Sequence, residues 1–163
     1  HQPLVDAVLA VHSRTVYSAP SPLQEACGRA LRVARETKYF ESMRALLRGK
    51  RDTLQKDLEA AGMPCWTPQG GYFLMAQSQS LANISSTMPN QEWAEFPGSQ
   101  EPEDYKRARW MTEHLGVACI PPSAFYEHEH LGDARDWLRF CFCKRDDTLL
   151  LAADRLKRLR ASL

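Results

Sequence analysis

The sequence predicts an α+β (split α/β) fold, in which helices back a small mixed sheet and a long inter-domain helix precedes that sheet. Apolar residues recur at helical spacing over most of the first 61 residues. From residue 66 onward, short apolar stretches alternate with a helical pattern and with polar loops. The resulting order of strand, helix, strand, strand and helix is typical of one small sheet covered by helices on one side.

The N-terminal part of the chain predicts helices. The first helix has an apolar stripe made by Leu4, Val5, Val8, Leu9 and His12. A second helix begins near residue 22, where Ser21 supplies an N-cap, Pro22 suits the first helical position and Gln24 completes a capping box. Its pattern blurs at residues 36–38 and then resumes until Gly62. We therefore expect a long helix with a break at 36–38, whose second half bridges two bodies.

The C-terminal part of the chain predicts three strands and two helices. The expected strands are 65–76, entered through Gly70 and Gly71, then 117–122 and 137–143. The stretches 77–103 and 123–136 are polar and aperiodic, and they predict surface loops. One expected helix ends at Gly116 and has Tyr105, Ala108, Met111, Thr112 and Leu115 on one face. The other expected helix begins at Asp146.

Composition excludes some classes of partner. The 163 residues include 21 basic and 20 acidic side chains, for a formal net charge of +1, so we expect no nucleic acid and no membrane partner. No apolar run spans a bilayer and no signal peptide is visible, which predicts a cytoplasmic or mitochondrial protein that is not secreted. The five cysteines fit no zinc motif and predict buried free thiols in a reducing compartment. The chain starts without methionine and within a helical pattern, so we expect a fragment.

Arg139 is the strongest candidate for a binding residue. The stretch 137–143, WLRFCFC, alternates so that Arg139 shares one side of a strand with Trp137, Cys141 and Cys143, opposite Leu138, Phe140 and Phe142. A permanent charge in so apolar a strand is costly unless an anion meets it. Arginine suits a planar carboxylate, because its fork donates two parallel hydrogen bonds. The alternatives are an ion pair with an internal carboxylate and a strand end that reaches solvent.

Other candidates are weaker. The trio His128, Glu129 and His130 could bind a metal, but without a third ligand at a suitable spacing we interpret it as a solvated turn and expect no metal. Ser18 and Ser123 lack the surroundings of a catalytic nucleophile, and no glycine-rich phosphate loop is present. From the residues alone, binding a carboxylate is the most that we expect of this chain, and a non-catalytic dimerisation or ligand-binding α+β module stays an alternative.

Four stretches in order resemble one family. These are VHSRTVYSAPSPLQEA (11–26), PQGGYFLM (68–75), GVACIPPSAFY (116–126) and WLRFCFCKRDDTLLLAADRL (137–156). Together they are similar to the C-terminal part of fold-type I pyridoxal-phosphate aminotransferases, nearest to the kynurenine aminotransferases, also called glutamine transaminase K or cysteine-S-conjugate β-lyase. The resemblance implies that residues 1–36 are the end of a large cofactor-binding domain and that 37–163 are the small C-terminal domain with its bridging helix.

The resemblance also implies roles for individual residues. Arg139 matches the arginine that binds the α-carboxylate of the substrate. Tyr17 matches an aromatic residue that lines the substrate pocket of the partner subunit in a homodimer, and Ser18 stands where histidine is frequent. Phe125 falls near the substrate entrance. The implied substrates are amino acids, such as kynurenine or glutamine, and 2-oxo acids.

The cofactor implied for the full-length enzyme is pyridoxal 5′-phosphate. In the family it is bound covalently by a lysine in an S.[ST]K stretch, and no lysine of this chain stands in that context. We therefore expect no catalytic lysine in this chain, no cofactor bound to it and no activity of the fragment by itself.

Overall fold

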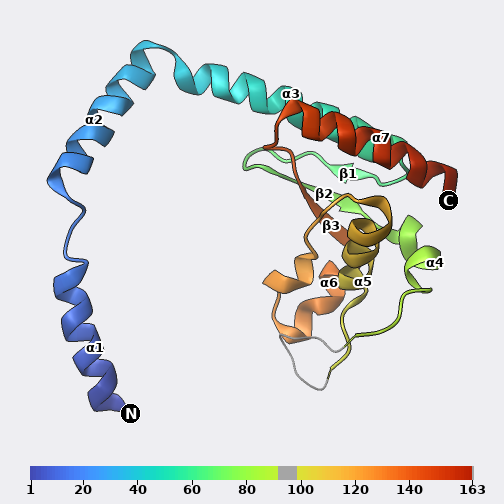
Figure 1. Cartoon of the computed structure of the whole chain (residues 1–163), viewed down its shortest axis with the longest axis horizontal. Helices are drawn as coiled ribbons and strands as arrows, with labels where there is room; N and C mark the ends of the chain where they lie inside the picture. Colours follow the sequence, from blue (N-terminus) through green and yellow to red (C-terminus); the bar gives the residue numbers. More distant parts are fainter. Residues whose placement is uncertain (92–98, 163) are drawn as a thin grey trace. The chain divides into compact units, whose positions relative to one another are not determined.

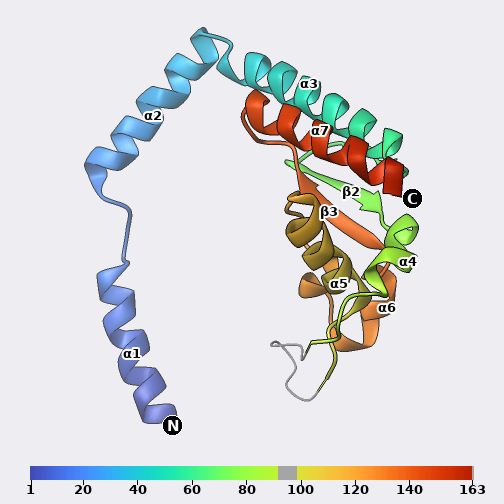
Figure 2. The same cartoon turned by 45° about the vertical axis from the view of Figure 1, so that its right-hand side comes forward.

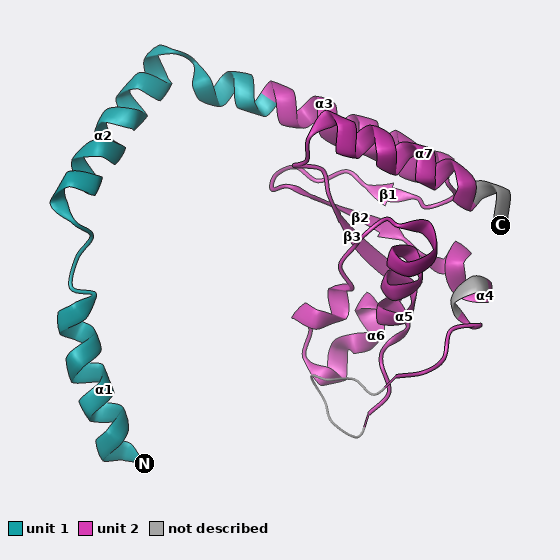
Figure 3. Ribbon diagram, in the orientation of Figure 1, with its two compact units in different colours: residues 1–44 teal, residues 45–163 magenta. Residues whose placement is uncertain are grey.

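The computed structural model of the chain describes residues 1–91 and 99–162. The chain divides into two compact units, residues 1–44 and residues 45–163 (Figure 3). We describe each unit by itself. None of the described helices combines the length and the apolar character that crossing a bilayer requires.

The first unit is helical. It contains α1 (Gln2–Thr15), α2 (Ser21–Glu36) and the start of α3 (Tyr39–Ala60). The break predicted at 36–38 is confirmed, because Lys38 has a φ of 53° between α2 and α3. The predicted N-cap is wrong by one residue: Pro20 precedes α2, Ser21 is its first residue, and the Gln24 side chain donates to the Ala19 carbonyl at 2.7 Å.

The second unit holds the sheet and the remaining helices. Its strands are β1 (Cys65–Trp66), β2 (Phe73–Gln77) and β3 (Trp137–Cys141). Its longer helices are the rest of α3, α5 (Glu103–Trp110), which continues into the π-helical turn η2 (Met111–Leu115), and α7 (Asp146–Ser162). Short helices are η1 (Gln79–Leu81), α4 (Ala82–Ser85), η3 (Pro122–Phe125), η4 (His128–His130) and α6 (Leu131–Ala134).

The sheet is antiparallel throughout, in the order β1-β2-β3, so the predicted mixed sheet is wrong. The stretch 65–76 forms a hairpin of two strands rather than one strand, because Gly71 (φ 75°) lets the chain reverse between β1 and β2. Of the predicted strand 117–122, only Ile120 pairs, through an isolated antiparallel bridge to Arg139. The predicted loops 77–103 and 123–136 contain short helices, and residues 92–98 of the first lie outside the described residues.

One apolar core lies on one face of the sheet. The alternating residues Leu74 and Ala76 of β2 and Leu138 and Phe140 of β3 are buried there. In both views α7 lies alongside the C-terminal part of α3 over the sheet (Figures 1 and 2). These helices contribute Leu54, Leu58, Leu149, Leu156 and Leu159, and α5 and η2 contribute Ala108, Met111 and Leu115. Each large apolar side chain buried in this way stabilises the fold by about 1.5–3 kcal/mol.

Candidate functional site

The second face of the sheet, which we call the outer face, is aromatic and carries one cation. Its residues are Trp66 of β1, Phe73, Met75 and Gln77 of β2, and Trp137, Arg139 and Cys141 of β3. Trp66, Met75 and Arg139 form one cross-strand row, because Trp66 pairs with Met75 and Met75 pairs with Arg139. The rings of Trp66 and Trp137 meet edge to face at 5.9 Å. The predicted alternation of β3 is confirmed, since Leu138 and Phe140 are buried on the core side.

Two phenyl rings hold the Arg139 guanidinium. Its central carbon lies 4.2 Å from the centroid of the Phe73 ring and 4.3 Å from that of Phe125. Phe73 pairs with Cys141 and is therefore the diagonal neighbour of Arg139 across β2 and β3. Such contacts suit a guanidinium, which stacks on aromatic faces through its planar charge. The rings fix the plane of the fork without using its hydrogen-bond donors.

No carboxylate neutralises Arg139 within the described part of the chain. Its guanidinium makes no hydrogen bond or ion pair to any residue that the structure describes, and its Nε is buried without a partner. The side chain as a whole is half-buried. A half-buried cation whose donors are unused is suited to binding an anion from outside the chain.

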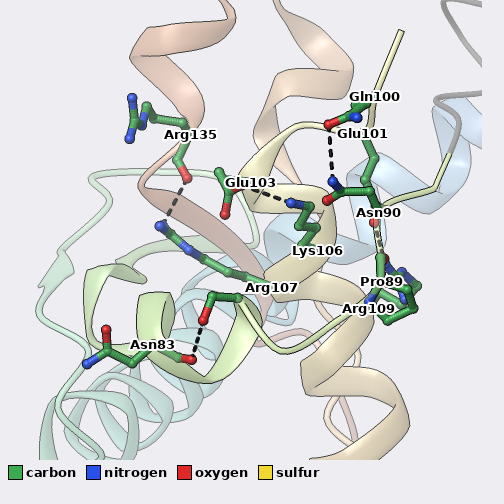
Figure 4. A network of polar contacts seen from close by, with 11 residues as sticks. Asn83, Pro89, Asn90, Gln100, Glu101, Glu103, Lys106, Arg107, Arg109 and Arg135 are labelled. Carbon is green, nitrogen blue, oxygen red and sulfur yellow. Dashed lines mark hydrogen bonds and ion pairs between the residues drawn. The ribbon is translucent and has the colours of Figure 1, made fainter. Parts of the chain in front are cut away.

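Arg107 shows the contrasting arrangement in the same unit. Its Nη1 donates to the Ser78 hydroxyl, the Arg135 carbonyl and the Asp136 carboxylate, each at 3.0 Å, and the side chain is only 4% exposed. Figure 4 shows Arg107 pointing to the Arg135 carbonyl. Burial raises the pKa of Asp136, but the hydrogen bonds from Arg107 and Gln79 outweigh burial and hold the pKa below its ordinary value. Arg107 is thus a structural cation that ties α5 to the residues before β3.

The segment 120–125 borders the site. Ile120 and Arg139 exchange two backbone hydrogen bonds of 2.9 Å, and Phe125 stacks on the Arg139 guanidinium. Between them, Ser123 is anchored to α5: its backbone N–H donates to Asp104 Oδ2 at 2.9 Å, and its hydroxyl lies 2.8 and 2.7 Å from the two Asp104 oxygens. Burial raises the pKa of Asp104, and its hydrogen bonds with Ser123 act in the opposite direction.

The structure brings some of the predicted site residues together. Arg139 and Phe125 are in contact. Tyr17 and Ser18 belong to the first unit, in the segment between α1 and α2, where both are exposed and Tyr17 is 86% exposed. Their implied role in a substrate pocket stays a prediction.

Sequence reasoning missed three residues of this region. The sequence predicts only that Phe73 lies in a strand, because the register that makes it a diagonal neighbour of Arg139 cannot be derived from one sequence. Asp104 and Ser123 form a pair separated by 19 residues. The one sequence signal for Asp104 was its position in the first turn of a predicted helix. Acidic residues are frequent there because they interact favourably with the helix dipole, so the signal is not specific.

The histidine trio and the cysteines are the remaining predicted features. The described residues contain no group of three or more His, Cys, Asp or Glu side chains placed to hold a metal ion. His130 is exposed and lies 3.7 Å from Asp133. All five cysteines are free, but Cys27 and Cys143 are exposed, so the expectation of buried thiols is wrong for these two. Burial raises the pKa of the Cys65 and Cys119 thiols to about 12, which makes them poor nucleophiles.

Comparisons with known proteins identify the class. The family profile described as "Aminotransferase class I and II" matches residues 1–156. Kynurenine–oxoglutarate transaminase 3 of Homo sapiens is 35% identical over 159 residues, which is 94% of this chain and 33% of the human protein. The kynurenine–oxoglutarate transaminase of Dictyostelium discoideum is 34% identical over 96% of this chain and 36% of its own length.

Solved structures agree with that class. The crystal structure of Bna3p from Saccharomyces cerevisiae matches 92% of this chain and 34% of its own, with a TM-score of 0.75 and 32% identity. That of YbdL from Escherichia coli, for which a methionine aminotransferase function was identified, matches 96% of this chain and 35% of its own, with a TM-score of 0.65 and 27% identity. The fold and the sequence therefore define the class as that of the aminotransferases. The chain belongs to the class I and II aminotransferase family, and it spans about a third of the length of the curated relatives it matches.

The family implies pyridoxal 5′-phosphate in the full-length enzyme, but the described residues do not form a site for it. Such a site needs a lysine that can bind the cofactor covalently, enclosed beside a phosphate cradle. Lys50, Lys106 and Lys157 are paired with Asp146, Glu103 and Asp154, respectively. The other lysines, which are Lys38, Lys56 and Lys144, are exposed. What the described residues offer is a half-buried cation, Arg139, whose hydrogen-bond donors are unused.

Proposed function

We propose that this chain is the part of a pyridoxal-phosphate-dependent aminotransferase that binds the carboxylate of its substrates. The substrates are amino acids, such as kynurenine or glutamine, and 2-oxo acids. The observation that carries the proposal is Arg139: a guanidinium between two phenyl rings, with no carboxylate partner among the described residues.

The chemistry required of the site fits this arrangement. Amino acids and 2-oxo acids share one group, a carboxylate next to the reacting carbon, so a single planar cation can bind both. Two parallel hydrogen bonds from one fork fix the orientation of a carboxylate as well as its position. Phe73 and Phe125 hold the plane of the fork, and the outer face around it is aromatic, which favours apolar or aromatic side chains on the substrate. The pyridoxal phosphate, when bound, supplies the electron sink for the reaction.

The test is Arg139→Ala in the full-length enzyme. Loss of a bidentate, charge-assisted contact should lower kcat/KM for both substrates by roughly 10²–10³-fold. The absorbance of the bound cofactor should stay unchanged, because Arg139 does not hold the cofactor in this proposal. Arg139→Lys is the matched variant, which keeps the charge but not the fork. Its kcat/KM should therefore lie between the values for the wild type and for Arg139→Ala. A near-normal kcat/KM for Arg139→Ala would refute the proposal.

We further propose that residues 1–36 end a large cofactor-binding domain and that 37–163 form the small domain of the enzyme. In the homodimer Tyr17 and Ser18 would line the partner subunit's substrate pocket. The apolar exposure of the first unit supports a covered position in the enzyme: Leu4, Val8, Val11 and Leu23 are each at least 60% exposed in this chain, and neither α1 nor α2 has a buried residue. The free thiols support a reducing compartment, either cytoplasmic or mitochondrial.

A separate test concerns the chain by itself. The cofactor would be held by parts of the enzyme outside this chain, so addition of pyridoxal phosphate to residues 1–163 should give no specific absorbance band and no single lysine trapped by borohydride. Stoichiometric trapping at one lysine would show that this chain carries a cofactor site of its own.

A further inference from the structure

The segment Ile120–Phe125 touches Arg139 at both of its ends. At Ile120 the contact is a pair of backbone hydrogen bonds of 2.9 Å, which fixes where the Arg139 backbone lies in the sheet. At Phe125 the contact is the ring, 4.3 Å from the guanidinium carbon, which fixes how the side chain is held. The position of the ring therefore depends on what holds the segment between its ends.

The middle of that segment is anchored at Ser123, and Pro122 beside it is also buried. Both Ser123 and its partner Asp104 are buried, with 1% and 0% of their surface exposed. The Asp104 carboxylate accepts the Ser123 N–H and contacts its hydroxyl with both oxygens. Phe125, two residues further on, is 63% exposed and so gains little from packing. The hydrogen bonds to Asp104 tie the backbone next to this ring to a different element, α5.

Asp104 itself is rigidly placed. It lies in the first turn of α5, whose Ala108 is in the core, and the helix continues into η2 with Met111 and Leu115. A helix N-terminus favours a carboxylate in its first turn. The chain of contacts thus runs from a core helix through Asp104 and Ser123 to Phe125 and to the plane of the Arg139 fork.

We propose that Asp104 is a positioning residue for substrate binding, which acts through Ser123 and Phe125 to orient the guanidinium of Arg139. This inference rests on the proposed carboxylate-binding role of Arg139. It predicts that loss of the Asp104–Ser123 hydrogen bonds weakens recognition of the carboxylate, and not only the stability of the fold.

The experiment measures carboxylate recognition by equilibrium binding to the full-length enzyme with its cofactor. The probes are 3-phenylpropanoate, an unreactive aryl carboxylate, and its amide, which has the same shape without the charge. Isothermal titration gives the ratio of the amide Kd to the acid Kd for each variant. A variant that is merely less stable keeps this ratio, because both ligands report on the same folded fraction.

Four variants separate the possibilities. Asp104→Ala removes both hydrogen bonds and should lower the ratio by about tenfold, because a misplaced fork loses its geometric advantage. Ser123→Ala removes only the hydroxyl and should lower it less. Asp104→Asn can still accept the Ser123 N–H and donate to the Ser123 oxygen, so it should restore most of the ratio. The control Ser78→Ala loses a buried hydrogen bond from Arg107 and should lower Tm with an unchanged ratio.

Each outcome decides between the two proposals. If Arg139→Ala brings the ratio close to one while Asp104→Ala leaves it at the wild-type value, the positioning role is wrong and the carboxylate site stands. If Arg139→Ala itself leaves the ratio unchanged, the proposed function is wrong. An equal loss in Asp104→Asn and Asp104→Ala would contradict a role through hydrogen bonds. Should Asp104→Ala fail to fold, Ser123→Ala decides, and an unchanged ratio in it overturns the inference.

Discussion

Arg107 and Arg139 are two arginines of the same compact unit in opposite electrostatic situations. Arg107 lies on α5, is nearly fully buried and has a carboxylate, a hydroxyl and a carbonyl around its Nη1. Arg139 lies on β3, is half-buried, and has two phenyl rings but no acceptor among the described residues. In both, Nε is buried without a hydrogen-bond partner, so that feature alone does not separate them.

The difference lies in what the rest of each guanidinium meets. A buried cation that is paired with a carboxylate contributes to a single arrangement of the chain, and its removal leaves buried acceptors without their donor. A cation held by ring faces keeps its donors available for an anion that arrives later. The first arrangement predicts an effect on stability, and the second predicts an effect on binding.

The largest effect on stability should follow replacement of Arg107. Arg107→Ala leaves Asp136, the Ser78 hydroxyl and the Arg135 carbonyl without their shared donor, which should cost about 3–5 kcal/mol in the free energy of unfolding. Arg139→Ala removes no such pair but does remove two partly exposed ring contacts, so its cost should be smaller, about 1–2 kcal/mol. Urea unfolding of the two variants in the full-length enzyme measures both values. Equal destabilisation would mean that Arg139, too, is a structural cation.

A smaller effect is expected at the two rings that flank Arg139. Phe125→Ala or Phe73→Ala removes one ring face from the guanidinium, a contact of about 0.5–2 kcal/mol. The KM for the amino acid should rise by a few-fold to about 30-fold in each variant, and Phe125→Tyr, which keeps a ring face, should stay near the wild type. Steady-state kinetics with a saturating 2-oxo acid provides the KM values. A fall in kcat with an unchanged KM would contradict a role in binding.

The smallest effect concerns the pH dependence of stability. The pKa of Asp136 lies below its ordinary value of 3.8, so Asp136 contributes stability above pH 3.8 that is lost as the pH falls through its folded pKa. Asp136→Asn removes this titration, and its Tm should therefore fall less steeply with acid than that of the wild type. Differential scanning calorimetry between pH 5 and 2 (roughly the window set by this linkage) gives both slopes. Parallel slopes would mean that Arg107 does not perturb Asp136.

The sequence predicts the face on which Arg139 lies in its strand, and it predicts some helix boundaries. The alternation in WLRFCFC placed Arg139 opposite Leu138 and Phe140, and helical spacing with glycine stops located the break before α3 and the end at Gly116. Local patterns suffice there, because side-chain direction in a strand or helix follows from periodicity alone.

What the sequence could not predict depends on contacts between distant segments. The antiparallel register that puts Phe73 beside Arg139 joins β2 to β3, two strands that are far apart in the sequence. The Asp104–Ser123 pair and the Arg107–Asp136 pair join residues 19 and 29 positions apart. Short helices such as η3 and α6 contain too few residues to produce a periodic signal, so they had been interpreted as loops.

The most direct test is a crystal structure of the full-length enzyme with an unreactive carboxylate ligand bound. The account predicts both carboxylate oxygens within hydrogen-bond distance of the Arg139 guanidinium, which stays between Phe73 and Phe125. A ligand whose carboxylate is bound elsewhere, with Arg139 paired to an aspartate or glutamate of the enzyme, would contradict it.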